Sequence, residues 1–288
     1  MGQTDRTPDG VDTYLADARD LDSYRQAEAE LSKLQVPILL HTGNPHERLF
    51  IAAMDGTGNS MFKDNPENWS VAAKIAKQID ALKNTGVTDI AAGYIEGTFT
   101  QNNPVTRVRD GITGHTFEQR VETAYLQFCV QAKKWIDEDP HAQIRIAGIG
   151  FSRGAEQVAA LTRMIEERGI LDPADARITF DRDRLVTRIE YTKPPLVEPG
   201  KTLQAAMLLD PVSTGVKEHD RRLPSSVVSA FQISAEDERR DQFKSTNLLQ
   251  PGFTEGHRFL NVTVAGAHSN IGGCYALNGL GVRNFNLG

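Results

Sequence analysis

The segment Ile149-Gly150-Phe151-Ser152-Arg153-Gly154-Ala155 holds the residues of this chain that are best suited to covalent chemistry. A serine hydroxyl acts as a nucleophile when it projects from a strained strand-to-helix turn and a base takes its proton. Gly150 and Gly154 are expected to keep such a turn free of Cβ clashes, and the N–H of Arg153, in the first turn of the following helix, is expected to point toward a developing oxyanion. The pattern predicts a nucleophile elbow centred on Ser152, and the alternative is a turn serine on an ordinary βα connection.

A serine nucleophile of this kind needs a carboxylate and a histidine, which follow it in that order in α/β-hydrolases. Of the seven histidines, His268 alone follows a strong strand, and glycines surround it. Asp210 comes directly after the apolar run Met207-Leu208-Leu209, where an unpaired charge would be costly to bury. We therefore expect Asp210 and His268 to be the acid and the base. The alternatives are that Asp210 caps the following turn and that His268 is a solvated loop histidine.

A second oxyanion donor would come from the loop after an early strand. The turn-rich segment 55–59, Asp55-Gly56-Thr57-Gly58-Asn59, follows such a strand, so the backbone N–H of Gly56 or Thr57 fits this role. Asp55 could hold the loop by accepting its amides, or could join a metal site with oxygens such as that of Asn59. The lack of regular carboxylate spacing favours the structural role, and we expect no metal ion and no cofactor.

The elements that must position these residues are indicated by hydrophobic periodicity and by turn signals. Helices are predicted over 11–34, 69–84, 117–138 and 155–168, the third starting at a capping box of Thr116 and Gln119. Strands are predicted over 49–54, 88–94, 143–149, 185–192, 204–209, 227–233 and 259–264, with a long loop over 95–115.

Strands that alternate with helices predict an α/β fold, with a mostly parallel central sheet and helices on both faces. Ligands of such sheets bind beyond the carboxyl ends of the strands, where Ser152, Asp210 and His268 are all expected to lie. Residues 1–48 are predicted to form an N-terminal helical extension, and residues 49–288 to form an α/β-hydrolase catalytic domain.

Composition excludes several classes of function. The net charge of −6 offers no broad basic surface, so nucleic acid is not an expected partner. Cys129 and Cys274 are too few for a disulfide framework, which favours folding in a reducing cytoplasm. The first residues lack the apolar core of a Sec signal, and no run reaches the roughly 18 apolar residues of a membrane span. Any export is expected to use another route.

Four blocks of sequence, taken together, resemble the α/β-hydrolase phospholipases that include lipase effectors of bacterial type VI secretion. The blocks are Met54–Asn59, the elbow Gly150–Ala155, the run Glu236–Arg240 with Phe243, and Gly266–Gly273. The resemblance implies hydrolysis of glycerophospholipid esters, of the A1 or A2 type, by an antibacterial effector. It also implies a membrane phospholipid substrate, secretion machinery that delivers the protein to the periplasm or membrane of a target cell, and a cognate immunity protein.

The chain departs from the pattern of these relatives at two positions. Asn270 stands where aspartate is expected after His268-Ser269, and Cys274 stands where a third glycine is usual. Relatives continue beyond this block, so the end at Gly288 suggests a catalytic domain truncated at its C-terminus. Two other functions stay open: a soluble carboxylesterase or thioesterase, and a non-catalytic hydrolase-like binding module.

Overall fold

The computed structural model of the chain describes residues 15–100, 116–214, 220–237, 245–254, 256–274 and 280–287. The main sheet has seven strands, which are β1 (Glu47–Met54), β2 (Ile90–Ile95), β3 (Gln143–Phe151), β8 (Leu203–Leu209), β9 (Val227–Ala235), β10 (Gly252–Thr254) and β11 (Phe259–Val264). Two small antiparallel sheets pair β4 (Ile170–Leu171) with β7 (Pro195–Val197) and β5 (Arg177–Phe180) with β6 (Val186–Glu190).

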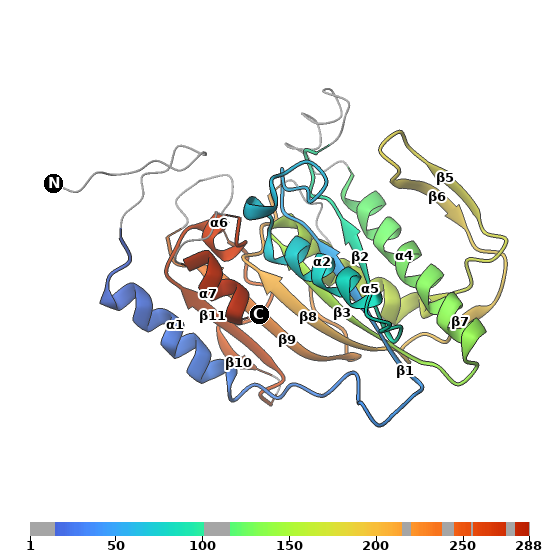
Figure 1. Cartoon of the computed structure of the whole chain (residues 1–288), viewed down its shortest axis with the longest axis horizontal. Coiled ribbons are helices and arrows are strands. Elements are labelled where there is room, and N and C mark those ends of the chain that lie inside the picture. The colour runs from blue at the N-terminus through green and yellow to red at the C-terminus, as the bar shows by residue number, and fades with distance from the viewer. Residues whose placement is uncertain are drawn as a thin grey trace.

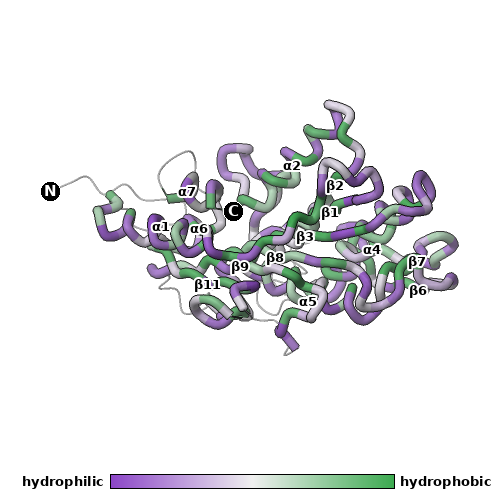
Figure 2. Tube along the Cα trace, turned by 90° about the horizontal axis from the view of Figure 1, so that it is seen from below, coloured by the Kyte–Doolittle hydropathy of each residue, from purple (hydrophilic) through white to green (hydrophobic). Residues whose placement is uncertain are grey.

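The α-helices are α1 (Ala18–Leu31), α2 (Val71–Lys83), α4 (Phe117–Glu138), α5 (Arg153–Arg168), α6 (His268–Ile271) and α7 (Leu280–Leu287). Helices cover both faces of the sheet (Figures 1 and 2). One face packs against α4 and α5, and the other packs against α1, α2, α6 and α7. In the part of the chain that the structure describes, no helix is long and apolar enough to cross a membrane.

The strand order of the main sheet is β10-β11-β9-β8-β3-β1-β2, and every neighbouring pair except β10 and β11 is parallel. This confirms the predicted α/β fold with a mostly parallel sheet. The chain runs from β1 outward to β2 and then returns to β3 on the other side of β1. The order therefore reverses between β1 and β3, and ligands of open α/β sheets bind at such a switch point.

Strand register brings the predicted site segments to one edge of the sheet. Met54 at the end of β1 pairs with Gly150, and Phe151 at the end of β3 pairs with Leu209 at the end of β8. The residues that come next are Asp55, Ser152 and Asp210. Three consecutive strand ends thus supply the loop, the nucleophile candidate and the acid candidate.

Helix α4 forms as predicted because its apolar residues recur on one face. Tyr125, Phe128 and Trp135 are buried there, and Phe128 packs against Phe50 of β1 with ring centroids 5.5 Å apart. Full burial of side chains of this size stabilises a fold by roughly 1.5–3 kcal/mol each, so this layer is a main source of stability.

The strand predicted over 185–192 forms as β6 (Val186–Glu190), but it pairs with β5 outside the main sheet, because its Thr187, Arg188 and Glu190 are exposed and offer no apolar face to bury. One local prediction is wrong. Thr116 does not cap α4 with its side chain: its φ of −96° and ψ of 12° are not extended, and its hydroxyl accepts a hydrogen bond from Arg120 Nε instead.

Other predictions are met only in part or concern residues outside the described part of the chain. The N-terminal helix runs from Ala18 to Leu31, shorter than expected, and residues 11–14 lie outside the described part. Most of the predicted loop over 95–115 and the run from Glu238 to Phe243 also lie outside it. Cys129 and Cys274 are free thiols.

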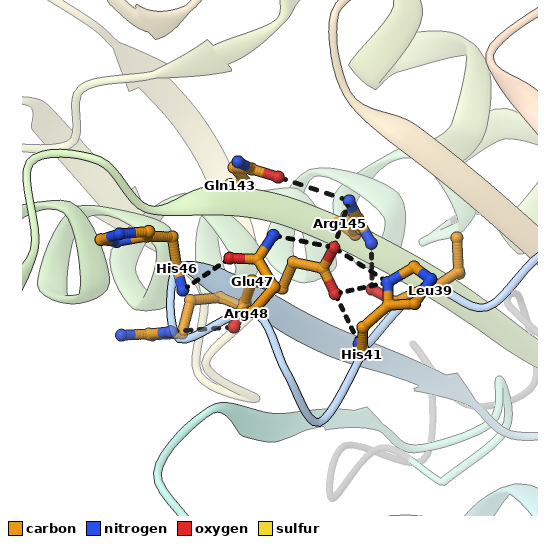
Figure 3. Close-up of polar contacts among 8 residues, drawn as sticks. Leu39, His41, His46, Glu47, Arg48, Gln143 and Arg145 are labelled. Carbon is orange, nitrogen blue, oxygen red and sulfur yellow. Dashed lines mark hydrogen bonds and ion pairs between the residues drawn. The ribbon is translucent and has the colours of Figure 1, made fainter.

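A buried charged cluster lies at the opposite edge, where β1 and β3 begin (Figure 3). The Glu47 carboxylate accepts hydrogen bonds from the backbone N–H and Nδ1 of His41 and from Asn44 Nδ2, and it pairs with Arg145 Nη2 at 2.8 Å. Burial by itself would raise the pKa of Glu47, but the His41 hydrogen bonds and the Arg145 charge lower it to about 2. This cluster joins the loop before β1 to both strands.

Candidate active site

Ser152 lies in a strained turn between β3 and α5. Its φ of 58° and ψ of −125° are rare for a residue with a Cβ, and such strain is common at functional sites. Its backbone N–H donates to Leu209 O at 2.9 Å, and its carbonyl accepts from Val212 N at 3.3 Å. The turn is therefore held against the end of β8 from both sides.

The two glycines of the motif allow close backbone approach. A Cβ on Gly150 would lie 2.4 Å from Gly154 O, and a Cβ on Gly154 would lie 2.2 Å from Met54 O. Both distances are far below van der Waals contact, so neither position accepts a side chain. The first turn of α5 consequently packs directly on the end of β1, next to the Asp55 loop.

Asp210 and His268 are hydrogen-bonded to each other. His268 Nδ1 lies 2.6 Å from Asp210 Oδ2, and both side chains are buried. Asp210 Oδ1 accepts two further hydrogen bonds, from Ala235 N at 2.9 Å and from Ser245 Oγ at 2.5 Å. With the carboxylate fixed on Nδ1, the imidazole presents Nε2 as its proton acceptor.

Ser152 lies beside this pair. Phe151, its chain neighbour, packs its ring on the His268 imidazole with centroids 4.6 Å apart, and Ser152 N–H bonds to the residue before Asp210. Ser152 Oγ is buried, and no hydrogen-bond partner for it occurs among the described residues. Catalytic hydrogen bonds are often long in unliganded enzymes and tighten with substrate.

Asp55 organises the loop after β1. Its Oδ1 accepts the Gly56 N–H at 2.8 Å, and its Oδ2 accepts the Tyr94 hydroxyl at 2.6 Å. Burial raises the pKa of Asp55 to about 6, although hydrogen bonds from Tyr94 and Ser70 oppose the shift. The Gly56 amide is therefore engaged, whereas no described residue accepts a hydrogen bond from the Thr57 N–H. Of the two predicted loop donors, Thr57 is the one available to a ligand.

The end of β2 holds the other side of this loop. Gly58 N donates to Thr98 O at 2.7 Å, and Thr57 Oγ1 lies 3.1 Å from Thr98 Oγ1. The buried Arg153 guanidinium donates to the same Thr98 hydroxyl at 3.2 Å. The motif did not single out Thr98 or Tyr94. The only signal for Tyr94 was its place at the end of the strand predicted over 88–94, and Thr98 lay in the loop predicted over 95–115.

Glu156 is a further buried carboxyl, one turn after Ser152 on α5. Burial raises its pKa to about 7, against the opposing charge of Arg221, whose Nε lies 3.2 Å from the carboxylate.

Among the described residues, no group of three His, Cys, Asp or Glu side chains could hold a metal ion. The chemistry available to this arrangement is transfer of an acyl group through a serine, a histidine and backbone donors.

One of the similar solved structures has a TM-score above 0.5 and shares this fold. A protein from Pseudomonas aeruginosa superposes with a TM-score of 0.58 at 15% identity. The alignment covers 95% of this chain and 49% of the Pseudomonas protein, so this chain spans about half the length of that protein. A protein of unknown function from Agrobacterium tumefaciens covers 83% of this chain and 90% of its own at 14% identity, with a TM-score of 0.33. An acetyl xylan esterase covers 75% of this chain and 81% of its own at 11% identity, with a TM-score of 0.26. The last two scores are too low to support an argument.

No curated protein matches the chain. A family model described as type VI secretion system phospholipase effector, Tle1-like, catalytic domain matches residues 48–194, about half of the 288 residues. The matched segment includes the Asp55 loop and Ser152 and ends before Asp210 and His268. The chain belongs to the Tle1-like phospholipase effector family of the type VI secretion system, and its matched segment is part of the catalytic domain.

Proposed function

We propose that the chain is a serine hydrolase that cleaves a carboxylic ester of glycerophospholipids, as a phospholipase of the A1 or A2 type. One observation carries the proposal: the 2.6 Å contact between His268 Nδ1 and Asp210 Oδ2, beside a serine in a strained strand-to-helix turn. A buried carboxylate on Nδ1 orients the imidazole and stabilises its protonated form, which is the state formed when serine loses its proton.

In the proposed mechanism, Ser152 Oγ attacks the ester carbonyl while His268 Nε2 takes its proton. The tetrahedral oxyanion receives the backbone N–H groups of Thr57 and Arg153, with Gly56 and Asp55 shaping the loop that carries Thr57. Collapse breaks the ester C–O bond, and His268 protonates the departing lysophospholipid alkoxide. A water molecule, deprotonated by His268, then attacks the acyl-serine carbonyl. The bond from the acyl carbon to Ser152 Oγ breaks, His268 returns the proton to Oγ, and a fatty acid is released.

The proposed biological role is supported by the family. Effectors of a secretion system act outside the cell that makes them, so the proposed target is the phospholipid of a competing bacterium, reached from its periplasm or membrane. A producing cell that carries such an enzyme needs a cognate immunity protein, which we include in the proposal. We treat residues 1–48 as an extension and residues 49–288 as the catalytic domain.

The test is hydrolysis of phosphatidylethanolamine and phosphatidylglycerol vesicles, with fatty acid and lysophospholipid identified by mass spectrometry. Ser152→Ala should lower the rate by several orders of magnitude, because the nucleophile is lost. Ser225→Ala is the matched control, since it removes an exposed hydroxyl that bonds to Glu166 and should keep the wild-type rate.

Other outcomes would replace the proposal. Activity on short acyl esters that does not rise on lipid vesicles would identify a soluble carboxylesterase or thioesterase. A fluorophosphonate probe that labels wild type no faster than Ser152→Ala would identify a hydrolase-like binding module, because only an activated serine reacts quickly.

A further inference from the structure

Helix α1 binds both backbone polar groups of Ala265, the residue that follows β11. The Ala265 N–H donates to Ser23 Oγ at 2.9 Å, and the Tyr24 hydroxyl donates to Ala265 O at 2.7 Å. Two consecutive side chains of the N-terminal helix thus hold one peptide segment about 240 residues further along the chain. Ala265 stands three residues before His268.

The remaining residues between Ala265 and His268 are also held by hydrogen bonds. Gly266 N donates to Asp237 Oδ2 at 2.9 Å, and Asp237 N donates to Gly266 O at 3.2 Å. Ala267 N donates to Asn270 Oδ1 at 3.0 Å. Gly266 has a φ of +119°, where a side chain is strongly disfavoured, so the chain makes a sharp turn between the two anchored segments.

Helix α1 is itself held in place by its N-terminal cap and by its buried face. Asp17 caps its N-terminus in a reciprocal capping box with Asp20, and this stabilises the first turn. Tyr24 and Ala27 are buried in the same hydrophobic cluster as Val264, Ala265 and Ile271. Figure 1 shows α1 beside β10 and β11, at the edge of the sheet away from β2. The contact is therefore a packed interface, and its two hydrogen bonds reach Ala265, three residues before His268.

We propose that α1 acts as a clamp on residues 265–267, the histidine loop that leads into His268. Ser23 and Tyr24 are then positioning residues that hold His268 in reach of Ser152. This inference rests on the proposed function, since it assigns the base of that reaction. The segment before β1 then has a role in catalysis beyond covering the sheet.

The physical reason is that Ala265 is only three residues from His268, so a shift of the Ala265 backbone also shifts the imidazole. A displacement of about 1 Å at a reacting group costs on the order of 10²-fold in rate. Asp210 and the Phe151 ring contact the imidazole, so the ring stays in reach of Ser152 only if its backbone also stays in place. The two hydrogen bonds to Ala265 hold the backbone from which His268 extends.

The test compares Ser23→Ala, Tyr24→Phe and the double variant in the full chain. Ester hydrolysis is expressed as kcat per serine titrated with a fluorophosphonate, so that misfolded protein does not count. The double variant should lose about 10- to 100-fold in kcat per titrated site. Its KM should stay within about twofold of the wild-type value, because no residue that binds substrate has changed.

Ser32→Ala is the matched control. Ser32 caps the C-terminus of the same helix, and its hydroxyl donates to Ala29 O as that of Ser23 donates to Asp20 O, but only Ser23 also accepts from Ala265. Ser23→Thr keeps the hydroxyl and should restore kcat. The clamp is refuted if the double variant and Ser32→Ala have the same kcat per titrated site.

A second measurement separates this proposal from the proposed function. The imidazole NMR signals of His268 should shift and broaden in the double variant and remain as in wild type in Ser32→Ala. If Ser152→Ala hydrolyses lipid as fast as wild type, the serine mechanism fails, and the NMR comparison alone decides whether α1 holds the loop. Unchanged His268 signals in the double variant would overturn the clamp.

Discussion

Tyr94 illustrates how a residue outside every motif shapes the chemistry of the site. Its hydroxyl donates to Asp55 Oδ2 and accepts from Met61 N at 3.0 Å, so it ties β2 to the start and the middle of the loop that carries Thr57. An oxyanion donor is useful only when it is preorganised. Tyr94 therefore supports the donor without contacting the substrate.

Tyr94→Phe is expected to lower kcat about 10-fold, less than the 10²- to 10³-fold cost of deleting an oxyanion donor, because Thr57 is displaced and not removed. Ester hydrolysis at saturating substrate measures the effect. Tyr191→Phe serves as the control, since Tyr191 is a partly buried tyrosine that packs on Tyr125. Equal kcat for the two variants would show that the loop needs no support from Tyr94.

At the scale of elements, the site depends on how closely α5 approaches β1. Gly154 in the first turn of α5 faces Met54 O and Asp55 O at the end of β1, with no room for a methyl group. The backbones of α5 and β1 are in contact here, so neither Gly154 nor Met54 can move without shifting the whole helix or strand. The elbow and the oxyanion loop are positioned by the same contact.

Gly154→Ala is therefore expected to destabilise the fold by about 1–3 kcal/mol, the usual cost of overpacking, and to lower activity in the fraction that folds. Thermal unfolding and fluorophosphonate labelling measure the two effects. Gly43→Ala is the matched control because a Cβ there meets nothing within 4 Å. A Gly154→Ala variant with the unfolding temperature of Gly43→Ala would contradict the packing.

At the scale of the whole molecule, the buried Glu47 cluster and the candidate active site lie at opposite ends of the parallel strands. The Glu47 cluster is at the amino end of β1 and the Asp55 loop follows its carboxyl end, about 26 Å away for eight residues of strand. Substitutions more than 7–10 Å apart with no shared partners act nearly independently. The cluster can thus be changed without touching the candidate active site.

Glu47→Gln is expected to lower the free energy of unfolding at pH 7 and to leave kcat unchanged. The pKa of Glu47 is about 2, below its value of 4.5 in an unfolded chain, so its stabilising effect is present above pH 4.5 and is lost as pH falls toward 2. Denaturant unfolding between pH 7 and pH 3 should show a smaller loss of stability for the variant than for wild type.

Glu30→Gln provides the comparison, because Glu30 in the last turn of α1 pairs with the exposed Lys33 just after the helix, and such surface pairs contribute little. If Glu47→Gln follows the same pH dependence as Glu30→Gln, the buried cluster does not control acid stability.

Local sequence determined much of this fold. The helical spacing of apolar residues predicts α4 with the bounds Phe117–Glu138, and the glycine pattern places Ser152 at a strand-to-helix turn. Both depend on residues within a few turns of one another, so a periodicity or a motif is enough to detect them. The order in which Ser152, Asp210 and His268 occur also predicts that they share one edge of a parallel sheet.

Only the tertiary structure decided which atoms meet. The bond of Ser245 to Asp210 and the bonds of Ser23 and Tyr24 to Ala265 join segments that are distant in the chain. Such contacts depend on strand order and on which helix covers which strand, and these arise from packing the whole core at once. A single sequence carries no local signal for them, because the partner is chosen by the fold and not by its neighbours in the chain.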